Sequence, residues 1–361
     1  MQALMQSARF GELILTNRIV MAPMTRSRSD ASAVPNAQMA EYYAQRASAG
    51  MIVAEGTAPS VDGLGYCRTP AIYSIAQIAG WRQVTDAVHA RGGQIVLQLM
   101  HCGRVANHHN KPVGSRTVGP SAVAAETELF TDTVGMAPTD KPEALSRVEI
   151  QQIIAEYRQA ALNARLAGFD GVELHCTSGY LPMQFMSENA NQRTDEYGGS
   201  PANRVRFSHQ VLAAMADAIG AGRVGLRFCP SNRFNDIADS DPAATFTELL
   251  RGLRGMNLAY LHIMRAHSKR IDAFAQAREQ FQGALIINDG FEPDSALAAV
   301  ESGMADAVSF GRHYIANPDL VERIRDGVAL AEFDRKTLYS LGAQGYTDYP
   351  AYRESLQEDY A

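Results

Sequence analysis

Three side chains that could act on a small molecule follow a short apolar run near the middle of the chain. The run Val172–Leu174 comes after a turn signal that begins at Gly168, and its brevity predicts a buried strand. His175, Ser178 and Tyr180 stand directly beyond it. Parallel α/β proteins place their chemistry at the carboxyl ends of strands. We therefore expect these side chains to project into one cleft; the simpler alternative is that they only cap a strand end.

The composition limits the kinds of partner that the chain can have. It has 361 residues, of which 46% are hydrophobic and 20% charged, as in globular proteins with one large barrel or two ordinary domains. A net charge of −6 and the lack of a basic run argue against nucleic acid or an anionic membrane as partner. No apolar stretch reaches the roughly 18 residues of a membrane span. The first residues lack the features of a signal peptide, so we expect a cytoplasmic protein.

Metal catalysis is not expected from the pattern of potential ligands. The four cysteines are scattered without a C-x-x-C pair, and the nine histidines include no H-E-x-x-H spacing. Cys102 and Cys176 lie near the predicted cleft, where the role of small buried hydrophobic residues is favoured over redox activity. We predict no metal site and no disulfide framework.

A short apolar run followed by a helical segment recurs along the whole chain. The apolar runs are residues 18–24, 51–58, 94–101, 171–177, 224–230, 258–264, 285–290 and 307–312. The helical segments between them are residues 36–49, 74–91, 147–167, 202–219, 242–254, 268–282, 293–302 and 318–327. Eight such units predict a (β/α)8 barrel. The competing fold is a doubly wound open sheet, but no G-x-G-x-x-G follows the first strand. We expect a single domain over residues 1–361.

Two segments fall outside this repeat. Residues 101–145 form a long insertion after the third strand that is rich in Gly, Pro, Ser and Thr, and insertions of this length are often functional lids. The tail from Thr337 to Ala361 carries five tyrosines, which predict that it packs on the barrel: Tyr339, Tyr346, Tyr349, Tyr352 and Tyr360.

The side chains at the other strand ends indicate a phosphorylated cofactor with a ring. Gln98 offers a donor and an acceptor side by side, which suits the imide edge of a flavin or a pyrimidine-like ring. Arg227 is a permanent cation that could stabilise a reduced, anionic ring. Gly311 and Arg312 follow the eighth strand, where barrel enzymes bind phosphate. Each of these side chains also has a structural alternative. Gln98 could be a satisfied interior amide, Arg227 could pair with a neighbour such as Glu173, and Arg312 could form a surface ion pair.

Five motifs, in order along almost the whole chain, resemble the Old Yellow Enzyme family. They are N-R-I-V-M-A-P-M-T-R at residues 17–26, Q-L-M-H-C-G-R at 98–104, the stretch 168–206, F-G-R-H-Y-I-A-N-P-D-L at 310–320 and G-A-Q-G-Y-T-D-Y-P at 342–350. The resemblance implies an FMN-containing (β/α)8 barrel that takes hydride from NADPH or NADH and passes it to activated alkenes. It implies ping-pong kinetics with no separate dinucleotide domain, and a monomer or homodimer.

The resemblance also assigns roles to individual residues. His175 would donate to the carbonyl or nitro oxygen of the substrate, Tyr180 would give a proton to the alkene carbon, and Ser178, Met100 and Tyr346 would line the substrate pocket. The residues implied at the flavin are Pro23, Met24, Thr25, Gly56, Gln98, Arg227, Asp289, Gly290, Gly311 and Arg312. A fixed donor at the oxygen would stabilise the developing enolate, and a phenol would complete the reduction.

Three departures from the family pattern bear on these roles. Ser178 stands where the family has Asn or His, and its shorter side chain weakens the contact with the substrate oxygen or leaves it to water. Met100 replaces a frequent tryptophan and softens the pocket. Asp289 takes a position usually held by glycine, and its carboxylate would repel a phosphate unless it points away or Arg312 compensates.

These departures keep two further hypotheses open. The same flavin chemistry could serve nitro compounds, nitrate esters or one dedicated biosynthetic intermediate. A barrel that has lost catalysis and only binds flavin or a phenol is the less favoured reading, supported chiefly by Asp289.

Overall fold

Eight parallel strands close into a barrel. The computed structural model describes residues 1–266, 268 and 271–352. The strands follow the order β3, β4, β5, β10, β11, β12, β13, β14, and β14 pairs with β3 again. Their bounds are β3 Ile19–Met21, β4 Met51–Thr57, β5 Ile95–Leu99, β10 Gly171–Cys176, β11 Val224–Phe228, β12 Tyr260–Met264, β13 Ala284–Asn288 and β14 Ala307–Phe310. Each predicted apolar run overlaps one of them, so the predicted (β/α)8 barrel is confirmed.

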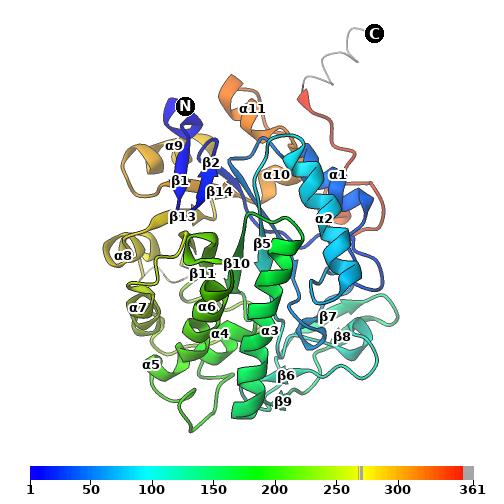
Figure 1. Cartoon of the computed structure of the whole chain (residues 1–361), viewed down its shortest axis with the longest axis vertical. Coiled ribbons are helices and arrows are strands. Elements are labelled where there is room, and N and C mark those ends of the chain that lie inside the picture. Colours follow the sequence, from blue (N-terminus) through cyan, green and yellow to red (C-terminus); the bar gives the residue numbers. More distant parts are fainter. Residues whose placement is uncertain (267, 269–270, 353–361) are drawn as a thin grey trace.

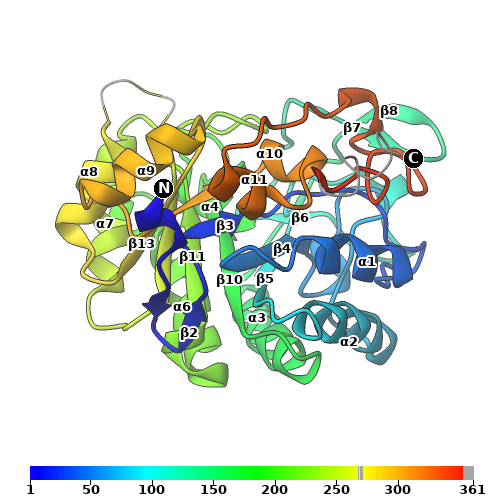
Figure 2. The same ribbon diagram turned by 90° about the horizontal axis from the view of Figure 1, so that it is seen from above.

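The helices lie outside the ring of strands (Figures 1 and 2). Those that follow the strands are α1 Ala37–Gln45, α2 Ile75–His89, α3 Arg147–Leu166, α6 Arg206–Ile219, α7 Pro242–Leu253, α8 Ala273–Gln280, α9 Pro293–Glu301 and α11 Leu320–Asp326. Ser146 and Asp241 cap α3 and α7, because their side chains accept from the backbone N–H groups of Glu149 and Ala244. The predicted helical segment 268–282 is shorter in the structure, and its residues 269–270 lie outside the described chain.

Several short helices were not predicted separately. They are α4 Leu181–Met186, α5 Pro201–Arg204, α10 Arg312–Ala316 and the 3-10 turns η1 Gln2–Met5, η2 Val61–Gly63, η3 His108–Asn110, η4 Ala221–Arg223 and η5 Arg335–Thr337. None of the helices in the described ranges is long and apolar enough to cross a membrane.

An N-terminal hairpin closes the amino end of the barrel. Its strands β1 (Ala8–Phe10) and β2 (Leu13–Leu15) are joined through Gly11, whose φ of 59° suits glycine. Phe10, Leu13 and Leu15 pack with interior residues near the start of the barrel strands, such as Val96 and Tyr260. Strands of three residues are too short for periodicity to reveal, and the hairpin was not predicted. With this end plugged, the opposite end is the one open to ligands.

The insertion after β5 has secondary structure of its own. A parallel pair joins β6 (Val118–Gly119) to β9 (Glu143–Ala144), and β7 (Glu128–Thr131) forms a hairpin with β8 (Gly135–Pro138). The buried side chain of Arg104 holds its base: the guanidinium donates to the carbonyl of Ala124 at 3.2 Å and pairs with Asp236 in the loop after β11. This segment is therefore anchored to the barrel at its base.

The described part of the tail packs on the first strand–helix unit, as predicted. Arg26 donates through Nη2 to the carbonyl of Gly345 at 2.6 Å, and Arg28 donates to the carbonyl of Thr337 at 2.9 Å. The ring of Tyr346 stacks on Tyr42 with centroids 4.0 Å apart. Tyr360 lies outside the described residues.

Candidate active site

Strand register brings polar side chains together inside the carboxyl end of the barrel. Glu173 lies opposite Gln98 of β5, and His175 lies opposite Arg227 of β11. Arg227 in turn lies opposite His262 of β12. Side chains of directly paired residues in neighbouring strands point to the same face, so these five line one interior surface.

His175 is held as a neutral donor. The backbone N–H of Thr177 donates to its Nδ1 at 3.4 Å, which leaves the ring hydrogen on Nε2. Burial, reinforced by the charge of Arg227, lowers the pKa of His175 to about 3. The ring meets that of Tyr180 edge to face, with centroids 4.7 Å apart.

Tyr180 is a buried, protonated phenol with a second tyrosine beside it. Its hydroxyl donates to the hydroxyl oxygen of Tyr66 at 3.1 Å. Burial, together with the proximity of Tyr66, raises the pKa of Tyr180 well above its usual value. Asn235, in the loop after β11, also donates to the Tyr66 oxygen at 3.3 Å. The phenol therefore keeps its proton at neutral pH.

Ser178 occupies a backbone conformation that serine seldom adopts. Its φ is +57°, in the left-handed region where asparagine is favoured among non-glycine residues. Its carbonyl accepts a hydrogen bond of 2.8 Å from Asn235 Nδ2, which fixes the turn between β10 and α4. In the described chain, no hydrogen bond engages the Ser178 hydroxyl.

Gly56 and Met100 fit one another at the ends of β4 and β5. Register between these strands shifts beyond Ala54, so Gly56 lies in a bulge. A Cβ at Gly56 would meet Met100 Sδ at 2.5 Å. Met100 is itself buried in a small cluster that includes Tyr66 and Tyr180. Met100 thus links the end of β4 at Gly56 to the two phenols.

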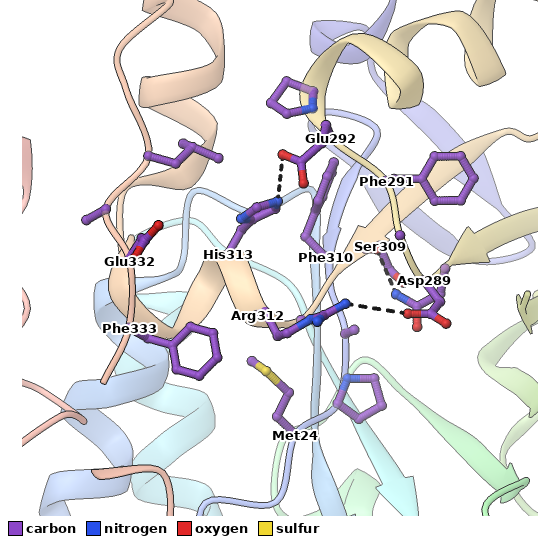
Figure 3. Close-up of a pocket in the computed structure, with 18 of the residues that line it drawn as sticks. Met24, Asp289, Phe291, Glu292, Ser309, Phe310, Arg312, His313, Glu332 and Phe333 are labelled. Atoms are coloured by element: carbon purple, nitrogen blue, oxygen red, sulfur yellow. Dashed lines mark hydrogen bonds and ion pairs between the residues drawn. The ribbon is translucent and has the colours of Figure 1, made fainter. Parts of the chain in front are cut away.

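A cavity of about 920 Å³ runs from the barrel interior over the ends of β13 and β14. The residues that line it include Pro23, Met24, Arg227, Asp289, Gly290, Gly311 and Arg312. Figure 3 labels Met24, Asp289 and Arg312 among them. Gly290 has a φ of +74°, and a Cβ at Gly311 would come within 3.4 Å of Met24 Sδ. Thr25 lines a neighbouring pocket together with Met24 and Arg312.

Asp289 pairs with a cation at the outer end of this cavity. Its carboxylate lies 3.8 Å from the Arg312 guanidinium, and Figure 3 shows the two side chains directed toward each other. The backbone of Asp289 has a φ of +83°, which a glycine would adopt without strain. Arg265 adds a second cation: its Nε donates to the Asp289 carbonyl, and its guanidinium lies 5.1 Å from the ring centroids of both Phe274 and Phe291.

Tyr346 takes part in anchoring the tail. Its side chain is fully buried against Tyr42, and the guanidiniums of Arg26 and Arg28 lie 5.1 and 4.7 Å from its ring centroid. Stacking and cation–π contacts therefore anchor the tail through this ring. These contacts give Tyr346 a role in anchoring the tail, and a place for it in the substrate pocket stays a prediction.

Sequence reasoning missed several polar residues at the site. Tyr66 and Asn235 lie in loops where no periodic pattern marks them, and Arg265 follows directly after β12. His262 and Asn288 had a usable signal, because each is a polar residue inside an otherwise apolar strand. Among the described residues, no group of three His, Cys, Asp or Glu side chains could hold a metal ion. Cys176 is buried, and burial raises the pKa of its thiol to about 12.

This donor set fits a flavin phosphate. The cavity is of the size usual for small-molecule sites, with a guanidinium and an amide at its inner end. At its outer end, the glycines Gly290 and Gly311 leave the backbone open to a ligand. The arginines Arg312 and Arg265 lie at the same end. Three carboxylates in the cavity wall, those of Asp289, Glu292 and Glu332, work against phosphate binding. Arg312 partly neutralises that of Asp289, and the Glu292 carboxylate lies 3.1 Å from His313 Nε2.

Comparison with known proteins agrees with this geometry. The model of the NADH:flavin oxidoreductase / NADH oxidase family matches residues 4–331. The chain belongs to this family. A probable flavin mononucleotide-dependent alkene reductase of Leishmania infantum is 44% identical, over 93% of this chain and 94% of the relative. 12-Oxophytodienoate reductase 7 of Oryza sativa subsp. japonica is 40% identical, over 93% of this chain and 91% of the relative.

Solved structures place the chain among the Old Yellow Enzymes. Morphinone reductase in complex with tetrahydroNAD superimposes with a TM-score of 0.93 at 44% identity, over 96% of this chain and 97% of the other. The Old Yellow Enzyme homologue of Zymomonas mobilis gives a TM-score of 0.93 at 38% identity, over 96% and 99%. This member of the family is accordingly an FMN-dependent oxidoreductase with a nicotinamide cofactor as its reductant.

Proposed function

We propose that this Old Yellow Enzyme reduces the C=C bond of α,β-unsaturated carbonyl or nitro compounds with NAD(P)H. The observation that carries the proposal is the pairing of a neutral His175 with a protonated Tyr180 at the mouth of β10. The names of three relatives support the substrate class, since an alkene reductase, a 12-oxophytodienoate reductase and morphinone reductase are all similar to this chain.

The residues of the cavity would hold the flavin over the barrel. Gln98 and Arg227 would contact the pyrimidine edge of the ring, while Pro23, Met24, Thr25 and Gly56 would border it. Gly290, Gly311 and Arg312 would bind the phosphate, with Asp289 beside them. When bound, the flavin supplies the hydride.

His175 and Tyr180 would perform the two tasks left to the protein. The Nε2–H of His175 would donate to the substrate oxygen and stabilise the negative charge that develops there. The Tyr180 hydroxyl would then protonate the carbon next to the activating group. Met100 and Ser178 would border the substrate, and the insertion of residues 101–145 would shield it from water. Substrate and nicotinamide would take turns in one site, which means ping-pong kinetics.

Ser178 favours a second candidate function within the same chemistry. Its hydroxyl is short, and the Asn235 bond to its carbonyl fixes the turn that carries it. His175 is then the one firm donor at the substrate oxygen, and the alternative acceptors to simple enones are nitro compounds, nitrate esters or one dedicated biosynthetic intermediate.

An anaerobic visible spectrum of the purified protein tests both candidates. NADPH should bleach the flavin band, and 2-cyclohexenone should restore it if simple enones are substrates. Bleaching that only a nitro compound or a nitrate ester reverses would favour the second candidate. A protein that is reduced by NADPH but reoxidised by none of these acceptors would contradict the proposed substrate class.

A further inference from the structure

Six polar side chains form one continuous network inside the barrel. Glu173 accepts from Gln98 Nε2 at 2.8 Å and from His262 Nδ1 at 2.8 Å. Arg227 Nη1 lies 2.5 Å from His262 Nε2, and Arg227 Nη2 donates to Asn288 Oδ1 at 2.7 Å. Ser309 Oγ lies 2.7 Å from His262 Nε2. These residues come from six different strands, and each is at most 7% exposed.

Glu173 remains charged in spite of its burial. Burial acts to raise its pKa, but His262, Arg227 and Gln98 outweigh this effect and hold the pKa of Glu173 below its ordinary value. Burial, with the charge of Arg227, lowers the pKa of His262 to about 4, so its ring is neutral at pH 7. The network therefore contains one negative charge, one positive charge and a neutral imidazole between them.

Stability alone does not explain such a network inside a barrel. A buried ion pair loses its hydration, and apolar residues of similar volume are often equally stabilising. One layer below, Val96, Ile286 and the ring of Tyr260 pack with the N-terminal hairpin. The charged network lies in the layer that borders the cavity, and its members Arg227, Asn288 and Ser309 line that cavity.

The contacts of Glu173 leave its neighbours with one orientation each. A carboxylate can only accept, so Gln98 must turn its amide nitrogen inward. The Gln98 carbonyl oxygen, which no hydrogen bond engages in the described chain, is then free to accept from a ring N–H. The same carboxylate fixes the hydrogen of His262 on Nδ1, so Nε2 can accept from Arg227.

We propose that Glu173 is a positioning residue for the cofactor: it orients Gln98 directly and Arg227 through His262, and its charge offsets that of Arg227. This inference rests on the proposed placement of Gln98 and Arg227 at the flavin. With Glu173 charged, a flavin bound there would meet a balanced pair of charges in place of a lone cation. Negative charge gained by its ring would be stabilised only in part, which would keep its reduction potential low enough for hydride to move on to an acceptor.

Glu173→Gln removes the charge and gives position 173 an amide that must donate as well as accept. We expect the reduction potential of bound FMN to rise, since Arg227 is no longer offset. The affinity for FMN should fall about tenfold, as for one lost hydrogen bond. Glu173→Asp keeps the charge but shortens the side chain, so it should weaken FMN binding while the potential stays close to that of the wild type.

Glu55→Gln is a matched control. Glu55 is also fully buried, but its carboxylate accepts from the Tyr43 hydroxyl and the backbone N–H of Arg26, outside the interior network. This variant should lose stability with an unchanged FMN potential.

The outcomes separate this inference from the proposed function. An unchanged potential and an unchanged FMN affinity in Glu173→Gln, with only a lower unfolding temperature, would show that the network is merely structural. If Glu173→Gln does not fold, a Glu173→Asp variant that binds FMN as tightly as the wild type would overturn the inference in the same way. A wild-type protein that binds no FMN would defeat both.

Discussion

The hydroxyl of Tyr180 donates to the hydroxyl of Tyr66 across 3.1 Å, and the two rings meet edge to face with centroids 6.1 Å apart. Tyr66 comes from the loop after β4, so two loops of the barrel meet at the proposed proton donor. Asn235 completes the arrangement from a third loop by donating to the Tyr66 oxygen. The position of the phenol is thus set by contacts outside its own strand.

Tyr180→Phe should separate the two halves of the reaction. Flavin reduction by NADPH should be unchanged, because no proton from Tyr180 is needed there. Reoxidation by an enone should slow by about 10²- to 10⁴-fold, the usual contribution of a general acid. Rapid mixing of each half-reaction measures both rates. Tyr66→Phe, which keeps Tyr180 but removes its partner, should slow reoxidation only about tenfold. Equal effects of the two substitutions would contradict the assignment of Tyr180 as the donor.

Ser178→Asn should improve enone turnover by about tenfold or more, because a longer amide can reach the substrate oxygen as a second donor. The backbone favours the change, since asparagine tolerates the φ of +57° better than serine does. Steady-state rates with 2-cyclohexenone are the measurement. Ser178→Ala is the control, and its rate should stay close to that of the wild type. If the asparagine variant gains nothing, Ser178 does not limit enone reduction.

The barrel could be predicted from the sequence because its strands are short, continuous apolar runs at regular intervals. Each of Val172–Leu174 and its counterparts is buried on both faces, and this burial leaves a clear mark in composition. The N-terminal hairpin could not be predicted from the sequence, because strands of three residues are too short to show a periodic pattern. The last predicted helical segment, residues 318–327, corresponds to α11, and the short helix α10 before Pro318 was not predicted.

The site was only partly predictable for a different reason. His175 and Tyr180 follow a strand, so their place at the cleft could be inferred from one segment. The contacts of Tyr66 with Asn235 join residues that are 169 positions apart, and no local pattern reports such a distance. The anchoring role of Tyr346 could not be predicted, because an aromatic residue in a tail can equally well be a pocket wall or an anchor. Its contacts with Arg26 and Arg28 join segments about 320 positions apart, and only the folded chain shows them.

Stability should fall as the pH drops from 7 to 5. Burial lowers the pKa values of His101 and His175 to about 3 and that of His262 to about 4, below the unfolded value of 6.5. The unfolded chain then binds more protons than the folded one. Each histidine therefore lowers the free energy of unfolding at pH 5 by on the order of 2 kcal/mol relative to pH 7. Glu55 acts in the opposite direction, because burial raises its pKa to about 7. Its gain in the free energy of unfolding offsets the loss from about one histidine.

His101→Gln checks this account by urea unfolding at both pH values. His101 is fully buried and its Nε2 has no partner in the described chain, so the substitution removes one titrating group. Between pH 7 and pH 5, the free energy of unfolding of the variant should fall by roughly 2 kcal/mol less than that of the wild type. An identical loss in both proteins would mean that His101 does not resist protonation.

Asp289→Gly should tighten the binding of FMN. The substitution removes a negative charge from the outer end of the cavity, frees Arg312 from its 3.8 Å ion pair and places glycine where φ is +83°. We expect the Kd for FMN, measured by quenching of flavin fluorescence, to fall about tenfold at low salt and less at high salt. Asp289→Asn separates the two causes, because it removes the charge and keeps a side chain that tolerates this backbone. Riboflavin, which lacks the phosphate, should bind all three proteins alike. A gain for riboflavin as large as that for FMN would show that backbone strain, and not phosphate repulsion, is what Asp289 contributes.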